Sequence, residues 1–365
     1  MSDPHFESHD QRAEAAPLED AVIRAYRHGD EHSLVTLLGL PFSHDVALEH
    51  WRWKLMHWPS TAPNVWLATA AGKAVFHYGG IPLRYSVNGS SATVMISVDA
   101  MTAPEFRRRG LLTRGTSRAF AEWKAQGIAF TLGLPNERWG SRTAAAGWRD
   151  LFPLQWLIRP LRPEVLAARR LGMPWPRRGT FITKLWRRLP RNRLRKHADI
   201  ELRRVTRAES CFDRLWDRCR PDAKFSAVRD SAWVQWRFLS SPTRKYDVVL
   251  AQRGHEAAGY SASYIEKTRE KTSAFLAELV GLDSDAATQE SLLAELVTNT
   301  YDAGADMLAT LAVPGTALHK SLLRSGFLRG PAFRAHIVPF APGLAMDLLR
   351  SPESWRLSGA DFDVL

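Results

Sequence analysis

The chain has 365 residues, of which 45% are hydrophobic and 24% charged, so it can bury the cores of two ordinary domains and is not a disordered or low-complexity protein. Its net charge of +12 is concentrated between residues 159 and 207, which carry 16 Lys or Arg against three acids. No apolar run approaches the roughly 20 residues of a membrane-spanning helix, and residues 1–12 lack the apolar core of a signal peptide, so the sequence predicts a soluble cytoplasmic protein.

A short pattern of residues occurs twice. Residues 53–59 (WKLMHWP) and residues 236–242 (WRFLSSP) share aromatic, basic and proline positions. Each is followed by a strand-like run, a turn that contains glycine and a second strand-like run, at residues 65–78 and 246–264. The pattern favours a duplicated unit, and the alternative is a chance similarity in a chain rich in tryptophan.

The two copies predict two domains joined by a linker. The stretch from residue 159 to residue 198 is rich in Arg and Pro and lacks strand alternation. The predicted organisation is a disordered tail, a first domain, a basic linker, a second domain and a C-terminal tail, at residues 1–18, 19–160, 161–198, 199–345 and 346–365.

The first copy alternates strands and helices. Residues 91–99 alternate apolar and polar side chains, as a half-buried strand does, and Pro104 ends this strand. Small and apolar residues then recur at helical spacing from Gly110 to Gly127. The remaining predicted elements are a strand, a short helix and an apolar stretch, at residues 128–134, 139–146 and 151–158. This order of elements indicates an α/β fold.

The turn between this strand and this helix has the chemistry of an anion site. A helix that begins near Gly110 presents unpaired backbone N–H groups and the positive end of its dipole, and the glycine lets the backbone approach a phosphate closely. Arg107, Arg108 and Arg109 add donors that suit phosphate geometry. The loop predicts that the chain binds a phosphate-bearing cofactor. The alternative interpretation is that the loop is only a solvated basic turn.

Residues 103–112 (APEFRRRGLL) resemble motif A of the GNAT acetyltransferases, written Arg/Gln-x-x-Gly-x-Gly/Ala, and the chain is similar to tandem GNAT proteins of the enhanced-intracellular-survival type. The resemblance implies two tandem GNAT folds, each a mixed, mostly antiparallel sheet flanked by helices, with acetyl-CoA or another acyl-CoA as cofactor. The cofactor-binding residues that it implies are Ala100, Met101, Thr102, Arg107, Arg108, Arg109, Gly110, Leu111, Leu112 and Asn136. Leu112 departs from the motif, which prefers Gly or Ala at that position.

Acyl transfer to an amine needs a base for the amine proton, donors for the oxyanion and an acid for the leaving thiolate. The resemblance places these groups on the fourth and fifth strands and makes Asp99 and Asn136 the catalytic candidates. The alternatives are an Asp99 that only holds a strand end and an Asn136 that only caps a helix. The tyrosine acid of the family is missing from residues 137–146, where Glu137 and Ser141 are weak substitutes. Some tandem members use a terminal carboxylate as base, which implies Leu365 here.

Histidine and cysteine do not indicate a metal site. His77 and Tyr78 lie on a predicted strand and could face the acceptor, although a histidine in a strand more often packs in the core. Cys211 and Cys219 lie two helical turns apart, which is too far for a disulfide. No spacing of His or Cys matches a metal signature, so no metal is predicted.

The second copy keeps the signals of the fold without the cofactor loop. The corresponding residues, 280–287, contain no Arg-x-x-Gly. They place Asp283 and Asp285 at a helix start, where both would repel a pyrophosphate. Residues 319–327 resemble the closing helix and strand of a GNAT domain. The second copy is therefore interpreted as scaffold and acceptor pocket.

The predicted function is transfer of an acetyl or other acyl group from acyl-CoA to a primary amine of a small molecule, amino sugar or peptide. Two alternatives stay open, a FemAB-like aminoacyl or peptidyl transferase and a non-catalytic basic adaptor. Residues 177–197 mix Arg and Lys with apolar residues, which is typical of docking on an anionic membrane or of a linker packed between domains. Nucleic acid is disfavoured as a partner, because no nucleic-acid-binding module accompanies the charge.

Overall fold

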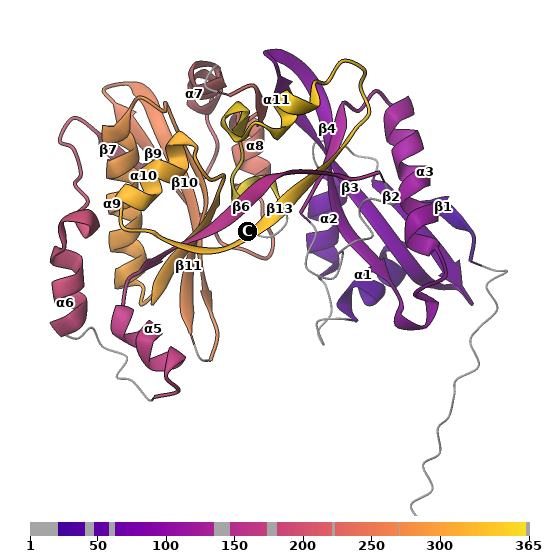
Figure 1. Ribbon diagram of the computed structural model, residues 1–365, viewed down its shortest axis with the longest axis horizontal. Coiled ribbons are helices and arrows are strands. Elements are labelled where there is room, and N and C mark those ends of the chain that lie inside the picture. Colours follow the sequence, from indigo (N-terminus) through magenta and orange to yellow (C-terminus); the bar gives the residue numbers. More distant parts are fainter. Residues whose placement is uncertain are drawn as a thin grey trace, which may run out of the picture.

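The computed structural model describes residues 21–40, 47–57, 63–134, 147–173, 181–220, 223–269 and 271–362. Figure 1 shows two lobes side by side, one built from the first half of the chain and the other from the second half. Helices flank a large mixed sheet in both lobes. This arrangement confirms the predicted α/β fold class.

The first half follows the order that the sequence predicts. Its elements are β1 (Ile23–Ala25), α1 (Glu31–Gly39), α2 (Leu48–Met56), β2 (Asn64–Ala70), β3 (Lys73–Val87), β4 (Ser90–Thr102), the short 3₁₀ helix η2 (Pro104–Phe106), α3 (Leu111–Ala125), β5 (Phe130–Gly133) and β6 (Arg149–Pro160). The predicted helix at residues 139–146 lies outside the described residues.

Two helices lie in the segment that the sequence assigned to a linker. They are followed by a short 3₁₀ helix, and the three elements are α5 (Pro163–Arg170), α6 (Phe181–Arg188) and η3 (Pro190–Asn192). Helical structure arises here because both segments combine good helix formers with basic last turns, which complement the helix dipole.

The second half repeats the element order of the first. Its elements are β7 (Glu201–Arg204), α7 (Cys211–Cys219), β8 (Phe225–Ala227), α8 (Ser231–Val234), the π-helical turn η5 (Gln235–Leu239), β9 (Asp247–Arg253), β10 (Glu256–Lys267), β11 (Thr272–Gly281), α9 (Ala286–Asp302), β12 (Met307–Ala312), α10 (Ala317–Arg324), β13 (Leu328–Pro339), α11 (Met346–Arg350), η6 (Pro352–Ser354), β14 (Trp355–Arg356) and η7 (Gly359–Asp361).

Side-chain contacts repeat between the halves as well. Arg24 in β1 pairs with Asp30 at 2.7 Å, and Arg203 in β7 pairs with Glu209 at 2.8 Å, both across six residues. The hydroxyl of Thr131 in β5 donates to the Met95 carbonyl at 2.9 Å, and in β12 the hydroxyl of Thr310 donates to the Leu276 carbonyl at 2.8 Å. The duplication seen in the sequence therefore extends to the local geometry.

One 14-stranded sheet runs through both lobes, in the order β1-β2-β3-β4-β5-β13-β6-β12-β11-β10-β9-β7, with β8 and β14 off this path. Neighbouring strands are antiparallel except in the pairs β4–β5, β11–β12 and β8–β14. The last long strand of each half is exchanged between the lobes. β6 of the first half pairs with β12 of the second half, and β13 of the second half pairs with β5 of the first half. Figure 1 shows these two strands crossing between the lobes.

Helices cover both faces of the first-half sheet. His77 on β3 contacts Trp51 of α2, whereas its neighbour Tyr78 stacks on Trp123 of α3 with ring centroids 5.7 Å apart. Because side chains alternate between the faces of a strand, α2 and α3 lie on opposite faces. A Cβ on Gly115 of α3 would come within 2.3 Å of the Phe76 ring, so this helix packs closely on β3.

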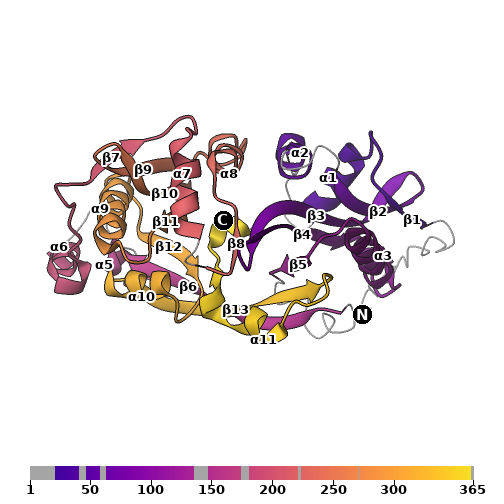
Figure 2. The same ribbon diagram turned by 90° about the horizontal axis from the view of Figure 1, so that it is seen from above.

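The two halves meet at the repeated tryptophans. Trp53 Nε1 donates to the Trp236 carbonyl at 2.9 Å, and Trp236 Nε1 donates to the Trp53 carbonyl at 3.1 Å. Their rings stack with centroids 5.4 Å apart. This reciprocal pair places the two copies of the sequence pattern in contact at the junction of the lobes, which Figure 2 shows from above.

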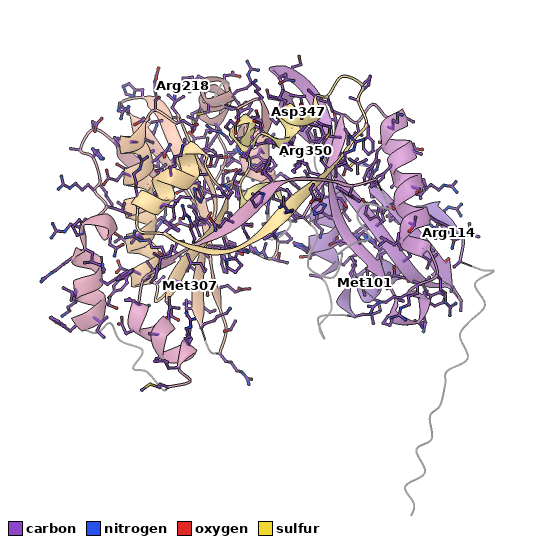
Figure 3. All side chains as sticks on the ribbon, viewed as in Figure 1. Met101, Arg114, Arg218, Met307, Asp347 and Arg350 are labelled. Carbon is purple, nitrogen blue, oxygen red and sulfur yellow. The ribbon has the colours of Figure 1, made fainter. Side chains whose placement is uncertain are left out.

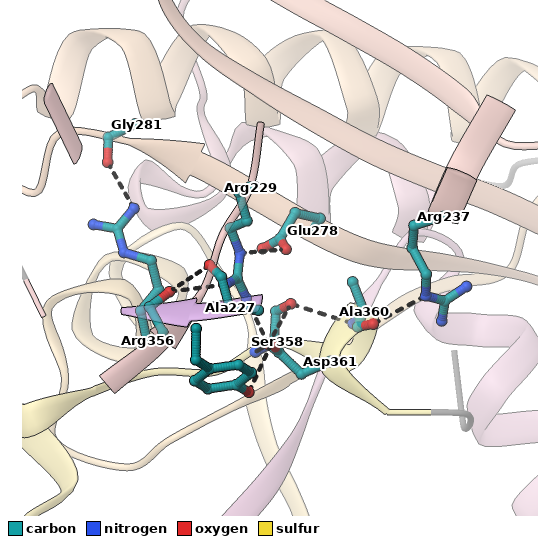
Figure 4. Close-up of polar contacts among 11 residues, drawn as sticks. Ala227, Arg229, Arg237, Glu278, Gly281, Arg356, Ser358, Ala360 and Asp361 are labelled. Carbon is teal, nitrogen blue, oxygen red and sulfur yellow. Dashed lines mark hydrogen bonds and ion pairs between the residues drawn. The ribbon is translucent and has the colours of Figure 1, made fainter. Parts of the chain in front are cut away.

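Residues 346–362, which the sequence assigned to a C-terminal tail, are packed into the same junction. Asp361 of η7 pairs with Arg229 at 2.5 Å, and Arg229 also pairs with Glu278 of β11 at 2.7 Å; all three side chains are buried (Figure 4). Arg237 donates to the carbonyls of Ala360 and Phe362. Charge pairing and burial thus fix this segment between the lobes.

Among the described residues, no helix has both the length and the hydropathy to cross a membrane. Cys211 and Cys219 in α7 are free and buried. Within the same described ranges, no three or more His, Cys, Asp or Glu side chains are grouped so that they could hold a metal ion.

Candidate functional site

The loop between β4 and α3 forms an open helix N-terminus. Gly110 precedes α3 with φ 76° and ψ 4°, a left-handed conformation that glycine adopts without strain. Space around Gly110 is open, since a Cβ added there would meet no atom within 4 Å. No side chain of the described residues caps the first turn of α3, and that turn contains no acid. Its N–H groups and the helix dipole are therefore available to an anion.

The three predicted arginines surround this helix start. Arg107 Nε donates to the Thr102 carbonyl at 3.2 Å, so its guanidinium turns back along the strand end. Arg108 is exposed and has φ 61°, and Arg109 lies over the Phe106 ring at 5.2 Å. Arg114 follows one turn into α3 and is labelled in Figure 3. The loop therefore has a strong positive potential next to free backbone donors.

Strands β4 and β5 separate beside the loop. They pair only at Met95 with Thr131 and at Ile96 with Leu132. Beyond this point β4 continues to Thr102 with β3 as its partner, while β5 pairs with β13 on its other side. One edge of the predicted residues Ala100, Met101 and Thr102 thus has no strand partner among the described residues. Such an edge offers backbone groups to an extended ligand arm.

The predicted residues of the loop come together in space. Ala100, Met101 and Thr102 are half-buried at the end of β4, and the Ala103 N–H donates to the Val75 carbonyl at 2.9 Å, which ties the strand end to β3. Leu111 is buried beneath α3, and Leu112 is half-buried. Both residues lie in the first helical turn, whose backbone N–H groups have no intrahelical partner, and the side chain of Leu112 packs against the hydrophobic core.

Asp99 lies at a bulge in β4. The pairing of β3 with β4 shifts between His77 and Gly79, and Asp99 has φ 52°. Its carboxylate pairs with Lys54 Nζ of α2 at 2.7 Å, with side-chain exposures of 17% and 6%. Burial alone would raise the pKa of Asp99, but the Lys54 charge and the hydrogen bond from Lys54 hold that pKa below its usual value. Asp99 is therefore ionised at neutral pH.

His77 holds the backbone of the same bulge. Its Nδ1 lies 2.7 Å from the Asp99 carbonyl, and its Nε2 lies 3.5 Å from Trp51 Nε1. The Trp51 N–H can only donate, so Nδ1 carries the proton and donates to the carbonyl. Burial lowers the pKa of His77, so the ring is neutral. The Tyr78 hydroxyl accepts a hydrogen bond from Ser97 at 2.9 Å. His77 and Tyr78 are both fully buried core residues, so neither side chain is open to an amine substrate.

Several candidates lie outside the described residues. These are Asn136, Glu137, Ser141 and Leu365. The last described residues, Ala360 to Phe362, line a small cavity of about 20 Å³ together with Lys54. Lys54 was not among the predicted site residues, because the repeated Trp-basic pattern at residues 53–54 and 236–237 does not indicate its contact with Asp99.

The corresponding loop of the second half is closed to anions. Asp285 caps α9 by accepting from the Thr288 N–H at 3.1 Å, and it also pairs with Arg253 at 3.2 Å. Asp283 pairs with Arg356 at 3.2 Å. The N–H groups in the first turn of α9 are therefore already bound by a carboxylate, whereas those of α3 have no side-chain cap among the described residues. An anion would be repelled at the start of α9 and attracted at the start of α3.

Comparison with known proteins connects this geometry to a family. Residues 22–148 match the model of a family described as acetyltransferase (GNAT) domain. A sequence search of curated proteins finds no match.

Solved structures share the fold over most of the chain. A GCN5-related N-acetyltransferase from Anabaena variabilis has a TM-score of 0.64 at 14% identity, over 88% of this chain and 73% of its own. N-myristoyltransferase from Saccharomyces cerevisiae, solved with myristoyl-CoA and inhibitors, has a TM-score of 0.62 at 14% identity, over 100% and 91%. Eis1 from Mycobacterium abscessus has a TM-score of 0.55 at 13% identity, over 88% and 73%. Residues 22–148 are therefore similar to a GNAT acetyltransferase domain, and over most of its length the chain shares the fold of these solved acyltransferase structures.

Proposed function

We propose that the chain is an N-acyltransferase that moves an acetyl or other acyl group from acyl-CoA to a primary amine. The observation that carries this proposal is the uncapped start of α3 behind Gly110, next to three arginines and the separated strands β4 and β5. The CoA pyrophosphate would bind the N–H groups of Leu111 and Leu112. The pantetheine arm would extend along the free edge of β4 at Ala100 to Thr102.

The thioester then lies between the separated strands, near the bulge at Asp99. The amine nitrogen attacks the thioester carbonyl and loses a proton, and the tetrahedral intermediate collapses with cleavage of the C–S bond. The CoA thiolate leaves and takes up a proton, so that an amide and the free CoA thiol form. Asp99 and Asn136 stay the proposed catalytic residues. For Asp99 the geometry supports a role through the bulge: it holds Lys54 and fixes the strand backbone, and its low pKa makes it a weak proton acceptor.

The second half is proposed as a degenerate copy, in a tandem arrangement like that of the enhanced-intracellular-survival branch. Asp285 and Asp283 occupy the positions that correspond to the anion-binding loop. One acyl-CoA per chain follows. The proposed domains keep the predicted boundaries at residues 160 and 198, and each domain contributes one long strand to the other.

A second candidate function rests on α6. Phe181, Ile182 and Leu185 are 77%, 49% and 55% exposed, on a helix that also carries Lys184 and Arg187. An amphipathic basic helix of this kind is suited to an anionic membrane surface. Flotation with phosphatidylglycerol vesicles tests it: Phe181→Ser with Leu185→Ser should abolish flotation, and unchanged flotation would remove this candidate.

Release of the CoA thiol during turnover with acetyl-CoA and a library of amines tests the enzymatic proposal. The wild type should release thiol with at least one amine, and Gly110→Asp should abolish release, because a carboxylate would stand in the anion site. Gly127→Asp is the matched control, since Gly127 has φ 77° at the other end of α3 and also lies in open space. Equal loss in both variants, or no loss in either, would contradict the proposed site.

A further inference from the structure

A second concave site lies in the other lobe, far from the acyl-CoA loop. It is a cavity of about 510 Å³ between the end of β6, α6, η3 and α9. Figure 1 and Figure 2 both place α6 beside α9, at the opposite end of the molecule from α3. The volume falls in the range of about 300 to 1,000 Å³ that is usual for small-molecule sites.

The lining of this cavity is strongly basic. Within the part of the chain that the structure describes, its lining contains five cationic side chains and no acid; the cations are Arg159, Arg187, Arg193, Arg195 and Lys196. Among the described residues only Lys196 has a carboxylate partner, Glu295. Of the four arginines, Arg159 is buried, whereas Arg187, Arg193 and Arg195 are exposed at the mouth of the cavity. An excess of positive charge lines the cavity, which favours occupation by an anion.

Arg159 is the central group of this cavity. It is only 3% exposed; its Nη2 donates to the Asn192 carbonyl at 2.9 Å, and its Nη1 has no hydrogen-bond partner among the described residues. Burial and the nearby Arg187 lower the pKa of Arg159 to about 10, so the guanidinium is still charged at neutral pH. A buried cation with a free donor is costly unless a ligand satisfies it.

The walls of the cavity are fixed by side-chain hydrogen bonds. Trp186 Nε1 donates to the Pro160 carbonyl at 3.0 Å, and Asn192 Nδ2 donates to the Trp186 carbonyl at 2.8 Å. Arg187 lies over the Tyr301 ring of α9 at 4.4 Å. These contacts hold α6 and η3 against the second lobe, so the site is formed before any ligand binds.

We propose that this cavity binds an organic phosphate, with the phosphate on the guanidinium groups of Arg159, Arg187 and Arg193. Arginine forks match phosphate oxygens in pairs, which a single ammonium does not. The cavity is much larger than a phosphate ion, so the ligand carries a further group. Asn192 Oδ1, also buried without a partner among the described residues, would accept from a hydroxyl of that group.

Titration calorimetry with glycerol 3-phosphate and with inorganic pyrophosphate tests this site. The wild type should bind both, and Arg187→Gln with Arg193→Gln should weaken binding at least tenfold. Lys184→Gln with Arg188→Gln is the matched control, because it removes the same charge from the same segment at residues that do not line the cavity. Thermal unfolding of both double variants checks that the fold is kept.

The source of the phosphate is decided by a second arm with phosphatidylglycerol vesicles. Flotation that is lost in the Arg187 and Arg193 variant, that is kept in Phe181→Ser with Leu185→Ser, and that pyrophosphate competes away assigns the site to a lipid headgroup. Binding of the soluble probes without flotation assigns it to a free metabolite. Binding should also persist in Gly110→Asp, which separates this site from the acyl-CoA loop. No binding by the wild type, or equal weakening in both double variants, would overturn the proposal.

Discussion

Burial and close partners determine the protonation states of the residues around the β4 bulge. His77 is enclosed and donates to the Asp99 carbonyl, while the Asp99 carboxylate keeps its charge because Lys54 lies 2.7 Å away. Removing either charge would leave the other buried and unpaired, which typically costs about 3 kcal/mol or more. The bulge is thus held by one neutral ring and one ion pair.

This arrangement predicts a dependence of stability on pH. His77 stays neutral in the fold because its pKa is lowered, whereas in the unfolded chain it takes up a proton below about pH 6.5. The unfolded state then binds more protons, so the free energy of unfolding falls as the pH falls below 6.5, by up to about 1.4 kcal/mol per pH unit. Above pH 6.5 His77 is neutral in both the folded and the unfolded state, so it no longer makes the free energy of unfolding depend on pH.

His77→Asn tests that prediction, because its amide can still donate to the Asp99 carbonyl and does not titrate. Urea unfolding at several pH values between 5 and 7.5 should show a smaller loss of stability in the variant than in the wild type. Comparison with the wild type is needed because burial also lowers the pKa of His319 and His336. Identical pH profiles would show that His77 is not the buried neutral group.

The sequence revealed some of these residues and concealed others. Asp99 was a candidate because the family resemblance places catalytic groups on this strand, and the loop from Arg107 to Gly110 was a candidate because charge and glycine mark a helix start. Lys54 could not be predicted, since its contact with Asp99 spans 45 residues and depends on the bulge. The bulge depends on how β3 pairs with β4, and the alternation of residues within one strand does not specify that pairing.

At the scale of elements, α3 is the part that connects fold to site. Its buried positions Leu111, Gly115, Ala119 and Trp123 recur every four residues and form one stripe against the sheet. This spacing made the helix predictable from the sequence. The close contact between Gly115 and Phe76 sets the distance between α3 and β3, and therefore the position of the α3 N-terminus.

Gly115→Leu should therefore destabilise the protein and weaken acyl-CoA binding together. The new side chain would meet the Phe76 ring, which lies 2.3 Å from the place of a Cβ, and overpacking of this kind costs about 1 to 3 kcal/mol. Ser117→Leu, on the exposed face of the same helix, is the control. Equal melting temperatures for the two variants would show that α3 tolerates displacement.

At the scale of the whole molecule, strand exchange makes the two lobes interdependent. β6 lies between β13 and β12, which both come from the second half, and β5 gains one of its two neighbours from β13. The sequence pattern predicted a strand at residues 128–134, near the observed β5, but could not assign its partners. The two halves have similar strands, so a strand can pair in either lobe, and only tertiary packing decides.

Residues 1–198 expressed alone should not fold into a stable monomer. β6 would lose both neighbouring strands, and Leu154 and Leu157, which are fully buried in the whole chain, would become exposed. Size-exclusion chromatography and thermal unfolding of this half should show aggregation or no cooperative transition, and coexpression with residues 199–365 should restore both. A soluble monomer with a sharp transition would contradict the role of the exchanged strands.

If one acyl-CoA binds per chain, at the helix start behind Gly110, calorimetric titration with CoA measures this directly. We expect a stoichiometry of one, at least a tenfold loss of affinity in Gly110→Asp, and unchanged affinity in both Gly127→Asp and Asp285→Asn. Two bound CoA molecules per chain, or the same affinity in Gly110→Asp as in the wild type, would contradict it.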